Sequence, residues 1–231
     1  MEKAVTSSQQ MPLSGPQRAL SFVEFAFGSF IVIGHNVFHI VPNEVPILFA
    51  LCILSVRLRE GSFAAIGLSR PKSWWLTILI AVITAAAVVA IGEVVTDPLA
   101  KTLGLASTGK AATALGAMKG DIWTALKGLG LVWTFAAFGE ELGYRRYLLG
   151  RAADIGNRTT IAHWIALLVV SALFGLGHYY QGPAGIFTTA CDGFVIGAAY
   201  LLSGRNLWVA VLTHGMIDTF GIAVLFLGLA N

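Results

Sequence analysis

Charged residues are scarce in this chain: they make up 12% of its 231 residues, whereas 56% are hydrophobic. An ordinary soluble domain has about 25% charged residues. So few charges exclude a soluble globular domain and indicate that lipid surrounds most of the chain. Cysteine is nearly absent as well. Cys52 and Cys191 both fall inside apolar stretches, so no disulfide framework is expected.

Long apolar runs are what the sequence does contain. A membrane-spanning helix needs about 20 mostly apolar residues. Six stretches meet this requirement, and a seventh is short. The predicted spans are Ala19–Val41, Val45–Val56 (the short one), Trp74–Val95, Ile122–Leu142, Ile161–Leu176, Ala184–Leu202 and Leu207–Leu229. The fourth is expected to continue past Arg145. The sequence therefore predicts an all-α, polytopic integral membrane bundle of about seven transmembrane helices, within a range of six to eight.

The basic residues are distributed unevenly between the two sides of this predicted bundle. With the N-terminus inside, the inner segments hold Lys3, Arg18, Arg57, Arg59, Arg70, Lys72, Arg145, Arg146, Arg151, Arg158 and Arg205. The outer side holds Lys101, Lys110, Lys119 and Lys127. Eleven against four follows the positive-inside rule and predicts a cytoplasmic N-terminus. The net charge of +3 is thus explained by topology, and no nucleic-acid partner is expected.

The chain reads as a single integral membrane domain over residues 1–231. The first eighteen residues lack the apolar core and cleavage site of a secretory signal, so no processing is expected. The compact size suggests a prokaryotic plasma membrane. The longest connection, Thr96–Asp121, is either a surface-lying segment or an ordinary loop. In the sixth span, Gly193 and Gly197 have the small-xxx-small spacing that permits close helix packing.

Two adjacent carboxylates stand at the end of an apolar run in TFAAFGEELGYRRYLLGRA (134–152). Residues four apart on a helix share a face, so Glu141 can pair with Arg145. Glu140 is turned roughly 100° away from Glu141 and meets no base on its own helix. A carboxylate shielded from water and without an ionic partner suits a general base. A charge pair that only locks helix ends would explain Glu141 and Arg145, but not Glu140.

Two histidines on later spans are candidates to join Glu140. At about 1.5 Å per residue, Glu140 and His178 lie roughly 25 and 31 Å from a turn near Asn157, which is a similar depth. His214 and Asp218 are four apart on the last span and share a face, at a shallower predicted depth. Each histidine taken alone could equally be a hydrogen-bonded core residue. Their arrangement on helices that can meet Glu140 favours a site.

Other polar residues in the spans point less clearly to chemistry. His35 and His39 form a possible ligand pair on the first span, although packing at the membrane interface explains them better. Asp192 lies deep in the sixth span, with an open role. Glu24 and Glu93 have the positions of helix-end charges. Zinc-helix and serine-elbow signatures, H-E-x-x-H and G-x-S-x-G, are absent from the sequence.

Taken in order, the motifs EELGYR (140–145), FGLGH (174–178) and HGMID (214–218) resemble the CPBP family. This family comprises the type 2 CAAX prenyl proteases and bacterial relatives linked to bacteriocin processing and immunity. The resemblance covers about Trp133 to Thr219. It implies an all-helical intramembrane protease whose site opens into a cavity within the bilayer.

The resemblance also implies roles for the site residues. Glu140 and His178 would activate a water, Glu141 and Arg145 would form a supporting pair, and His214 would steady the oxyanion. Asp218 stands where the prenyl proteases commonly have Asn. An ionised Asp cannot donate to an oxyanion, so it must be protonated, orient His214 or bind metal. A zinc-dependent mechanism stays open, but a metal-free mechanism without cofactors is favoured because the spacing matches no compact zinc signature.

Three functions remain compatible with these residues. The favoured one is an endopeptidase acting near the C-terminus of a membrane-associated protein or peptide, which could be a prenylated CaaX substrate. A second is a non-catalytic peptide-binding or immunity protein of the same fold. A third is a transporter with a proton relay, which the absence of an inverted repeat disfavours. Partners are therefore the bilayer and a membrane-associated peptide or protein.

Overall fold

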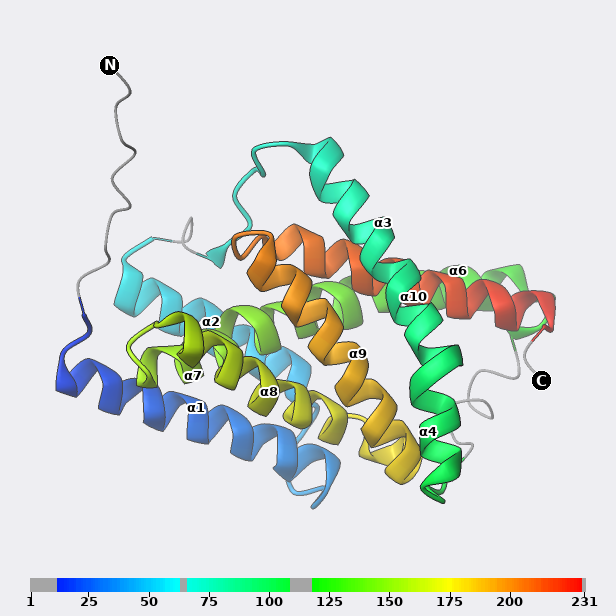
Figure 1. The fold of residues 1–231 in the computed structure, drawn as a ribbon, viewed down its shortest axis with the longest axis horizontal. Coiled ribbons are helices and arrows are strands. Elements are labelled where there is room, and N and C mark those ends of the chain that lie inside the picture. Colours follow the sequence, from blue (N-terminus) through cyan, green and yellow to red (C-terminus); the bar gives the residue numbers. More distant parts are fainter. Residues whose placement is uncertain (1–11, 63–65, 109–117, 230–231) are drawn as a thin grey trace.

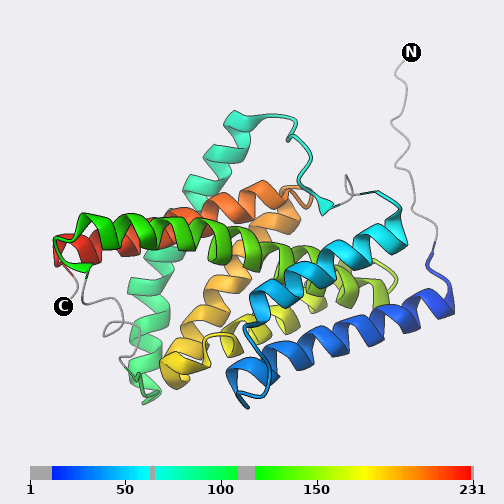
Figure 2. The ribbon, with the colours of Figure 1, turned by 180° about the vertical axis from the view of Figure 1, so that it is seen from behind.

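A computed structural model describes residues 12–62, 66–108 and 118–229, and these residues form helices and turns with no strand. The helices join into seven rods, which lie against one another as a bundle (Figures 1 and 2). The rods are α1 (Gly15–Asn36); α2 (Glu44–Glu60); α3 (Trp74–Ile91), π-helix η2 (Gly92–Thr96) and α4 (Asp97–Thr102); α6 (Ile122–Leu131), π-helix η4 (Val132–Leu148) and α7 (Leu149–Ile155); α8 (Thr160–Leu176); η5 (Tyr179–Gln181) and α9 (Gly182–Leu202); and α10 (Leu207–Leu227).

The fold class predicted from the apolar runs is confirmed. Five of the rods are long and apolar enough to cross a membrane, and α8 is a shorter apolar helix. The exception is α2, which corresponds to the short predicted span and carries Arg57 and Arg59 in its last turn. The protein is therefore an integral membrane protein built as a polytopic helical bundle.

Several predicted boundaries are wrong by a turn or more. The first helix ends at Asn36 rather than Val41, because the chain turns back with His39 at a positive φ of 54°. The third rod continues beyond Val95 to Thr102, which shortens the predicted loop at Thr96–Asp121. Lys110, in that loop, lies outside the described residues. The fourth rod continues past Arg145 to Ile155, as expected.

Side-chain caps start the helices where the sequence supplies them. Ser14 and Gln17 form a reciprocal capping box at the start of α1. The carboxylate of Asp121 accepts from two backbone amides at the start of α6, and Thr159 and Asn206 cap α8 and α10 in the same way. These caps satisfy amides that have no partner within the helix. They fix where each turn of the bundle ends and each rod begins.

Hydrogen bonds between turns define the two ends of the bundle. At one end, the backbone amide of Leu13 donates to Asn157 Oδ1 at 2.7 Å, and Asn206 Nδ2 donates to Thr77 Oγ1 at 3.0 Å. We call this the N-terminal end, because α1 starts there. At the far end, the amide of Ala184 donates to the carbonyl of Ala106 at 3.1 Å. The α8–α9 turn thus lies opposite the α7–α8 turn.

Small residues bring α9 close to α8, as the spacing of Gly193 and Gly197 predicts. A Cβ added to Gly193 would lie 2.8 Å from the ring of Phe174, and one added to Gly197 would collide with Leu167. The absence of a side chain at these positions lets the ring of Phe174 pack directly on the backbone of α9. This contact places Phe174 at the centre of the candidate site.

Candidate active site

The paired carboxylates lie on the π-helix η4, in the middle of the longest rod. In this segment amides bond to the fifth preceding carbonyl, as the amide of Leu149 does to Tyr144. π-Helical geometry is rare and frequently occurs at functional sites. The predicted α-helical geometry is therefore wrong here, although Glu141 and Arg145 still meet on one face.

Glu141 is completely buried and held from two sides. Arg145 Nε lies 3.0 Å from Glu141 Oε2, which confirms the predicted pairing. His214 Nδ1, on α10, lies 2.8 Å from Glu141 Oε1. This second contact was not anticipated from the sequence. It shows that α10 crosses η4 at the depth of the carboxylates, although counting residues along the helix put His214 at a shallower level.

Arg145 fastens η4 to the neighbouring helices. Its side chain is buried, and Nη2 donates to the backbone carbonyl of Gly193 at 3.1 Å. The guanidinium also lies 4.5 Å from the centre of the Phe174 ring, a geometry in which a cation is attracted to the face of an aromatic ring. Arg145 therefore supports Glu141 and fixes its position relative to α8 and α9.

Phe174 brings the two histidines together. Its ring centroid lies 5.1 Å from that of His178 and 6.0 Å from that of His214. His178 Nδ1 lies 3.0 Å from the carbonyl oxygen of Phe174, which favours the tautomer with a proton on Nδ1. In the neutral ring, Nε2 is then left as an acceptor. The segments that carry the two histidines thus meet at Phe174.

Asp218 stands beside His214, as the four-residue spacing predicts. Asp218 Oδ2 lies 3.5 Å from His214 Nε2, which is an ion-pair distance and longer than an ordinary hydrogen bond. Both ring nitrogens of His214 thus face carboxylates. A ring that carries protons on both nitrogens could donate to both of them.

Buried Oε2 of Glu140 has no hydrogen-bond partner within the described part of the chain, and Glu140, unlike Glu141, forms no ion pair with any described residue. His214, Glu141, Asp218 and Glu44 lie close enough for their charges to act on it. Glu140 also lines a groove of about 440 Å³ between α2 and the α6–η4 rod. The other lining residues are Asn43, Val45, Leu131, Val132, Phe135 and Ala136. The acid that sequence analysis left without a partner is thus the one that faces an apolar groove.

Glu44 was missed as a neighbour of the site. It is 7% exposed, and it binds His35 Nε2 at 3.2 Å and Asn36 Nδ2 at 3.0 Å. His35 Nδ1 also contacts the carbonyl of Val41, while His39 is exposed in the turn. The two histidines therefore do not form a ligand pair, and the packing interpretation holds. A signal for Glu44 was its place at the start of a helix, directly after the capping residue Asn43.

Three other acids were assigned loosely from the sequence. Asp192 lies half-buried on α9, close enough for the charges of Asp97 and His214 to act on it. Glu93 lies exposed in η2, within a rod that continues to Thr102, so it is not a helix-end charge. Glu24 is not one either. It accepts hydrogen bonds from Ser55 and Arg59 in a buried network at the N-terminal end.

A resident metal ion was considered from the donors that the site contains. Within residues 12–62, 66–108 and 118–229, no group of three or more His, Cys, Asp and Glu side chains has the geometry to hold a metal ion. At His214, both ring nitrogens are already directed at carboxylates. The site residues therefore do not fit a zinc centre in the arrangement described.

The bundle and its site define a membrane protein with paired glutamates on η4 and two histidines, one on α10 and one in the turn that follows α8. The family model described as type II CAAX prenyl endopeptidase Rce1-like matches residues 122–220. The match covers less than half of the chain, and it agrees with the resemblance carried by the three motifs. The family is one of membrane proteases, and hydrolysis of peptide bonds is the general activity that it implies. No curated protein and no solved structure matches the chain.

Proposed function

We propose that this protein is an intramembrane endopeptidase that uses Glu140 to activate water. The observation that carries the proposal is the buried, unpartnered Oε2 of Glu140 at the edge of an apolar groove. An unpaired carboxylate oxygen is expensive to bury, and a water or a substrate group would supply the missing hydrogen bond. Such a group is what a general base needs within reach.

The reaction would proceed by attack of this water on a peptide carbonyl. Glu140 accepts a proton as the water oxygen bonds to the carbonyl carbon, and it returns a proton to the nitrogen that leaves when the C–N bond breaks. The ring of His178 packs against Phe174. The lone pair on its Nε2 helps to orient the water. The walls of buried helices around the site strengthen each electrostatic contact.

His214 serves as the donor to the developing oxyanion. This role requires protons on both ring nitrogens, with Nδ1–H donating to Glu141 and Nε2–H directed into the site. Glu141 and Asp218 balance the positive charge, and Arg145 holds Glu141 in place. Asp218 is then a positioning residue for His214. The lone pair that Zn²⁺ would need on Nε2 is absent from this state, so a metal-free mechanism is preferred.

The substrate is a peptide or protein that reaches the site from the lipid phase. The groove beside Glu140 is lined mainly by apolar side chains, and lipid-facing apolar residues such as Leu131 and Phe135 surround its mouth. A segment near the C-terminus of a membrane-associated protein fits this access, and a prenylated CaaX tail is the member of this class that the family name suggests.

The same proposal places the N-terminal end of the bundle in the cytoplasm of a prokaryotic cell. Its support is the gathering of arginines at that end, including Arg18, Arg59 and Arg158, opposite Lys101 and Lys119. Single cysteines introduced at Gly61 and Gly104 of the Cys52→Ala, Cys191→Ala protein should label from opposite sides of the membrane. Labelling of both from one side would refute the topology.

The proposed activity is tested with purified protein and a prenylated CaaX peptide, in the presence and absence of a chelator. Cleavage that survives the chelator and is lost in Glu140→Gln supports the proposal. Cleavage that the chelator abolishes and zinc restores would replace it with a metal-dependent protease. Saturable binding of peptides without cleavage, for this peptide and for a library of hydrophobic leader peptides, would instead indicate a peptide-binding protein of the same fold.

A further inference from the structure

A second polar region lies at the N-terminal end of the bundle, away from the glutamates. It is a cavity of about 300 Å³ between the ends of α2, α7 and α9. Its charged lining consists of Arg146, Arg151, Arg158, Arg205, Glu60 and Asp154. Four guanidinium groups face two carboxylates, so the cavity has an excess of positive charge. We call it the arginine pocket.

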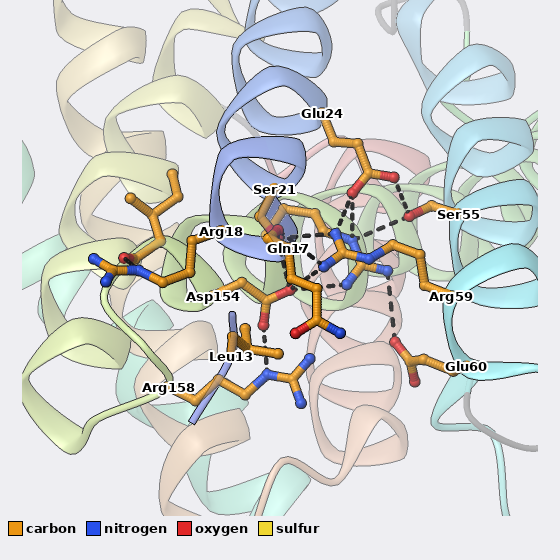
Figure 3. Close-up of polar contacts among 12 residues, drawn as sticks. Leu13, Gln17, Arg18, Ser21, Glu24, Ser55, Arg59, Glu60, Asp154 and Arg158 are labelled. Carbon is orange, nitrogen blue, oxygen red and sulfur yellow. Dashed lines mark hydrogen bonds and ion pairs between the residues drawn. The ribbon is translucent and has the colours of Figure 1, made fainter. Parts of the chain in front are cut away.

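The acids of the arginine pocket are already engaged. Asp154 binds Arg151 Nη1 at 3.0 Å and also contacts Arg158 and Arg59. Glu60 accepts from Arg146 Nη2 at 2.6 Å. Figure 3 shows Glu60, Asp154, Arg59 and Arg158 converging from α2 and from the end of α7 beside α1. These acids satisfy part of the cationic charge and hold the guanidinium groups in fixed positions.

Two of the arginines keep donors that no described residue satisfies. The side chain of Arg151 is 2% exposed, and its Nη2 has no hydrogen-bond partner; the nearest carboxylate oxygen, Glu60 Oε1, lies 3.5 Å away. The guanidinium of Arg205 is exposed and makes no hydrogen bond or ion pair with any described residue, so it is available to a ligand. Since buried polar groups are normally hydrogen-bonded, Nη2 of Arg151 lacks an acceptor. The excess of guanidinium groups in the lining favours an anion as this acceptor.

The arginine pocket continues into a groove between α8 and α9 that faces the lipid. This groove, of about 320 Å³, shares His163, Gly204 and Arg205 with the pocket. Its remaining lining is Thr160, Trp164, Leu201 and Leu202, and Leu202 is 76% exposed. A ligand that bridges the two would have an anionic head among the arginines and an apolar chain beside Trp164 and Leu202.

We propose that the arginine pocket binds the phosphate of an anionic phospholipid, with one acyl chain lying in the α8–α9 groove. Guanidinium groups bind phosphate oxygens through paired, charge-assisted hydrogen bonds. Basic pockets between transmembrane helices at this membrane depth are suited to lipid head groups. A free phosphate ion would satisfy the arginines but leave the groove unused, so the combined lining favours a lipid. This proposal does not depend on the protease activity.

The test uses the full-length protein in nanodiscs of phosphatidylcholine, with and without phosphatidylglycerol, followed by native mass spectrometry of the lipids that it retains. The wild-type protein is expected to retain phosphatidylglycerol in preference to phosphatidylcholine. Arg205→Gln should lower this retention about tenfold, the loss expected for one charge-assisted contact. Because Arg205 has no partner in the described chain, the variant should keep its fold, which its unfolding temperature in phosphatidylcholine checks.

Arg70→Gln is the matched control. Arg70 is exposed at the same end of the bundle but does not line the arginine pocket, so its loss should leave retention unchanged. Equal losses in both variants would show general surface attraction and overturn the proposal. Inorganic phosphate that raises the unfolding temperature of the protein as much as phosphatidylglycerol does would also overturn the proposal, because the site would then take a soluble anion. Equal retention of both lipids by the wild-type protein would have the same consequence.

Discussion

The candidate active site and the arginine pocket both take charged side chains from one rod, the first from η4 and the second from the end of η4 and from α7. In the active site, Arg145 is shared between Glu141 and the backbone of α9, and the glutamate that forms no ion pair with any described residue is Glu140. In the arginine pocket, exposed Arg205 has no partner among the described residues, and Arg151, although ion-paired with Asp154, keeps a buried Nη2 without a hydrogen-bond partner.

This difference separates two uses of buried charge. An unpaired carboxylate can take a proton from water, whereas an unpaired guanidinium cannot be deprotonated and can only attract an anion. The sign of the unpaired charge thus indicates chemistry at one site and binding at the other. The paired members of each cluster, Glu141 with Arg145 and Asp154 with Arg151, hold the unpaired groups in position.

The largest effect is expected at the unpaired carboxylate. Glu140→Gln should lower kcat by about 1,000-fold, within the range of roughly 10² to 10⁴ for loss of a general base. The unfolding temperature should hardly change, because Oε2 makes no hydrogen bond in the described structure. Rates with the prenylated peptide and a thermal unfolding curve provide the two measurements. Near-normal turnover would remove Glu140 from the mechanism.

The paired residues of the two clusters should differ in stability and in activity. Arg145→Ala and Glu141→Ala each break a buried ion pair, so each should lower the free energy of unfolding by about 3–5 kcal/mol. Arg151→Ala should cost less, about 1–3 kcal/mol, because Asp154 keeps its contacts with Arg158 and Arg59. Only the first two should also reduce kcat per folded molecule, because Arg151 does not contact the active site.

These variants are compared by denaturant unfolding and by rates corrected for the folded fraction. The comparison between the two clusters fails if Arg151→Ala reduces kcat per folded molecule as much as Arg145→Ala does.

Asp218 tests whether a second carboxylate is needed beside His214. Asp218→Asn supplies a neutral group of nearly the same shape and should keep kcat within about tenfold, whereas Asp218→Leu should lose roughly 100-fold, the scale for loss of an oxyanion donor. Rates and metal content of both proteins are the measurements. An inactive Asp218→Asn protein that has lost zinc present in the wild type would establish a metal mechanism.

Much of the active site was predictable from the sequence because it depends on local spacing. Glu141 and Arg145 are four apart, as are Phe174 and His178, and helical geometry brings such pairs together even where the helix has π-character. The unpaired state of Glu140 followed from the same spacing. The contact of His214 with Glu141 depends on how two helices cross, and distances along each helix do not determine that crossing.

The arginine pocket was not predicted, since its residues come from separate turns of the bundle. Glu60, Asp154 and Arg205 are far apart in sequence and meet only after the rods have packed. The basic residues there were explained by membrane topology alone, which is a correct but incomplete account. The end of α1 was also misplaced, because hydropathy changes little where an apolar helix gives way to an apolar turn. The end of the third rod was misplaced for the opposite reason, since the helix continues through the polar residues that follow Val95 to Thr102.

The smallest effect is expected from Gly193→Ala, which changes no charge. The added Cβ would lie 2.8 Å from Phe174, whose ring contacts Arg145 and both histidines. Overpacking should cost about 1–3 kcal/mol of stability. The displaced ring should lower kcat by about tenfold, less than the roughly 100-fold cost of a 1 Å misplacement. Retention of phosphatidylglycerol should stay normal, because the arginine pocket does not contain Phe174.

Gly221→Ala is the control, since its Cβ would meet nothing within 4 Å. Full activity of Gly193→Ala at normal stability would show that Phe174 does not position the site, and a parallel loss of lipid would show that the two clusters are not independent.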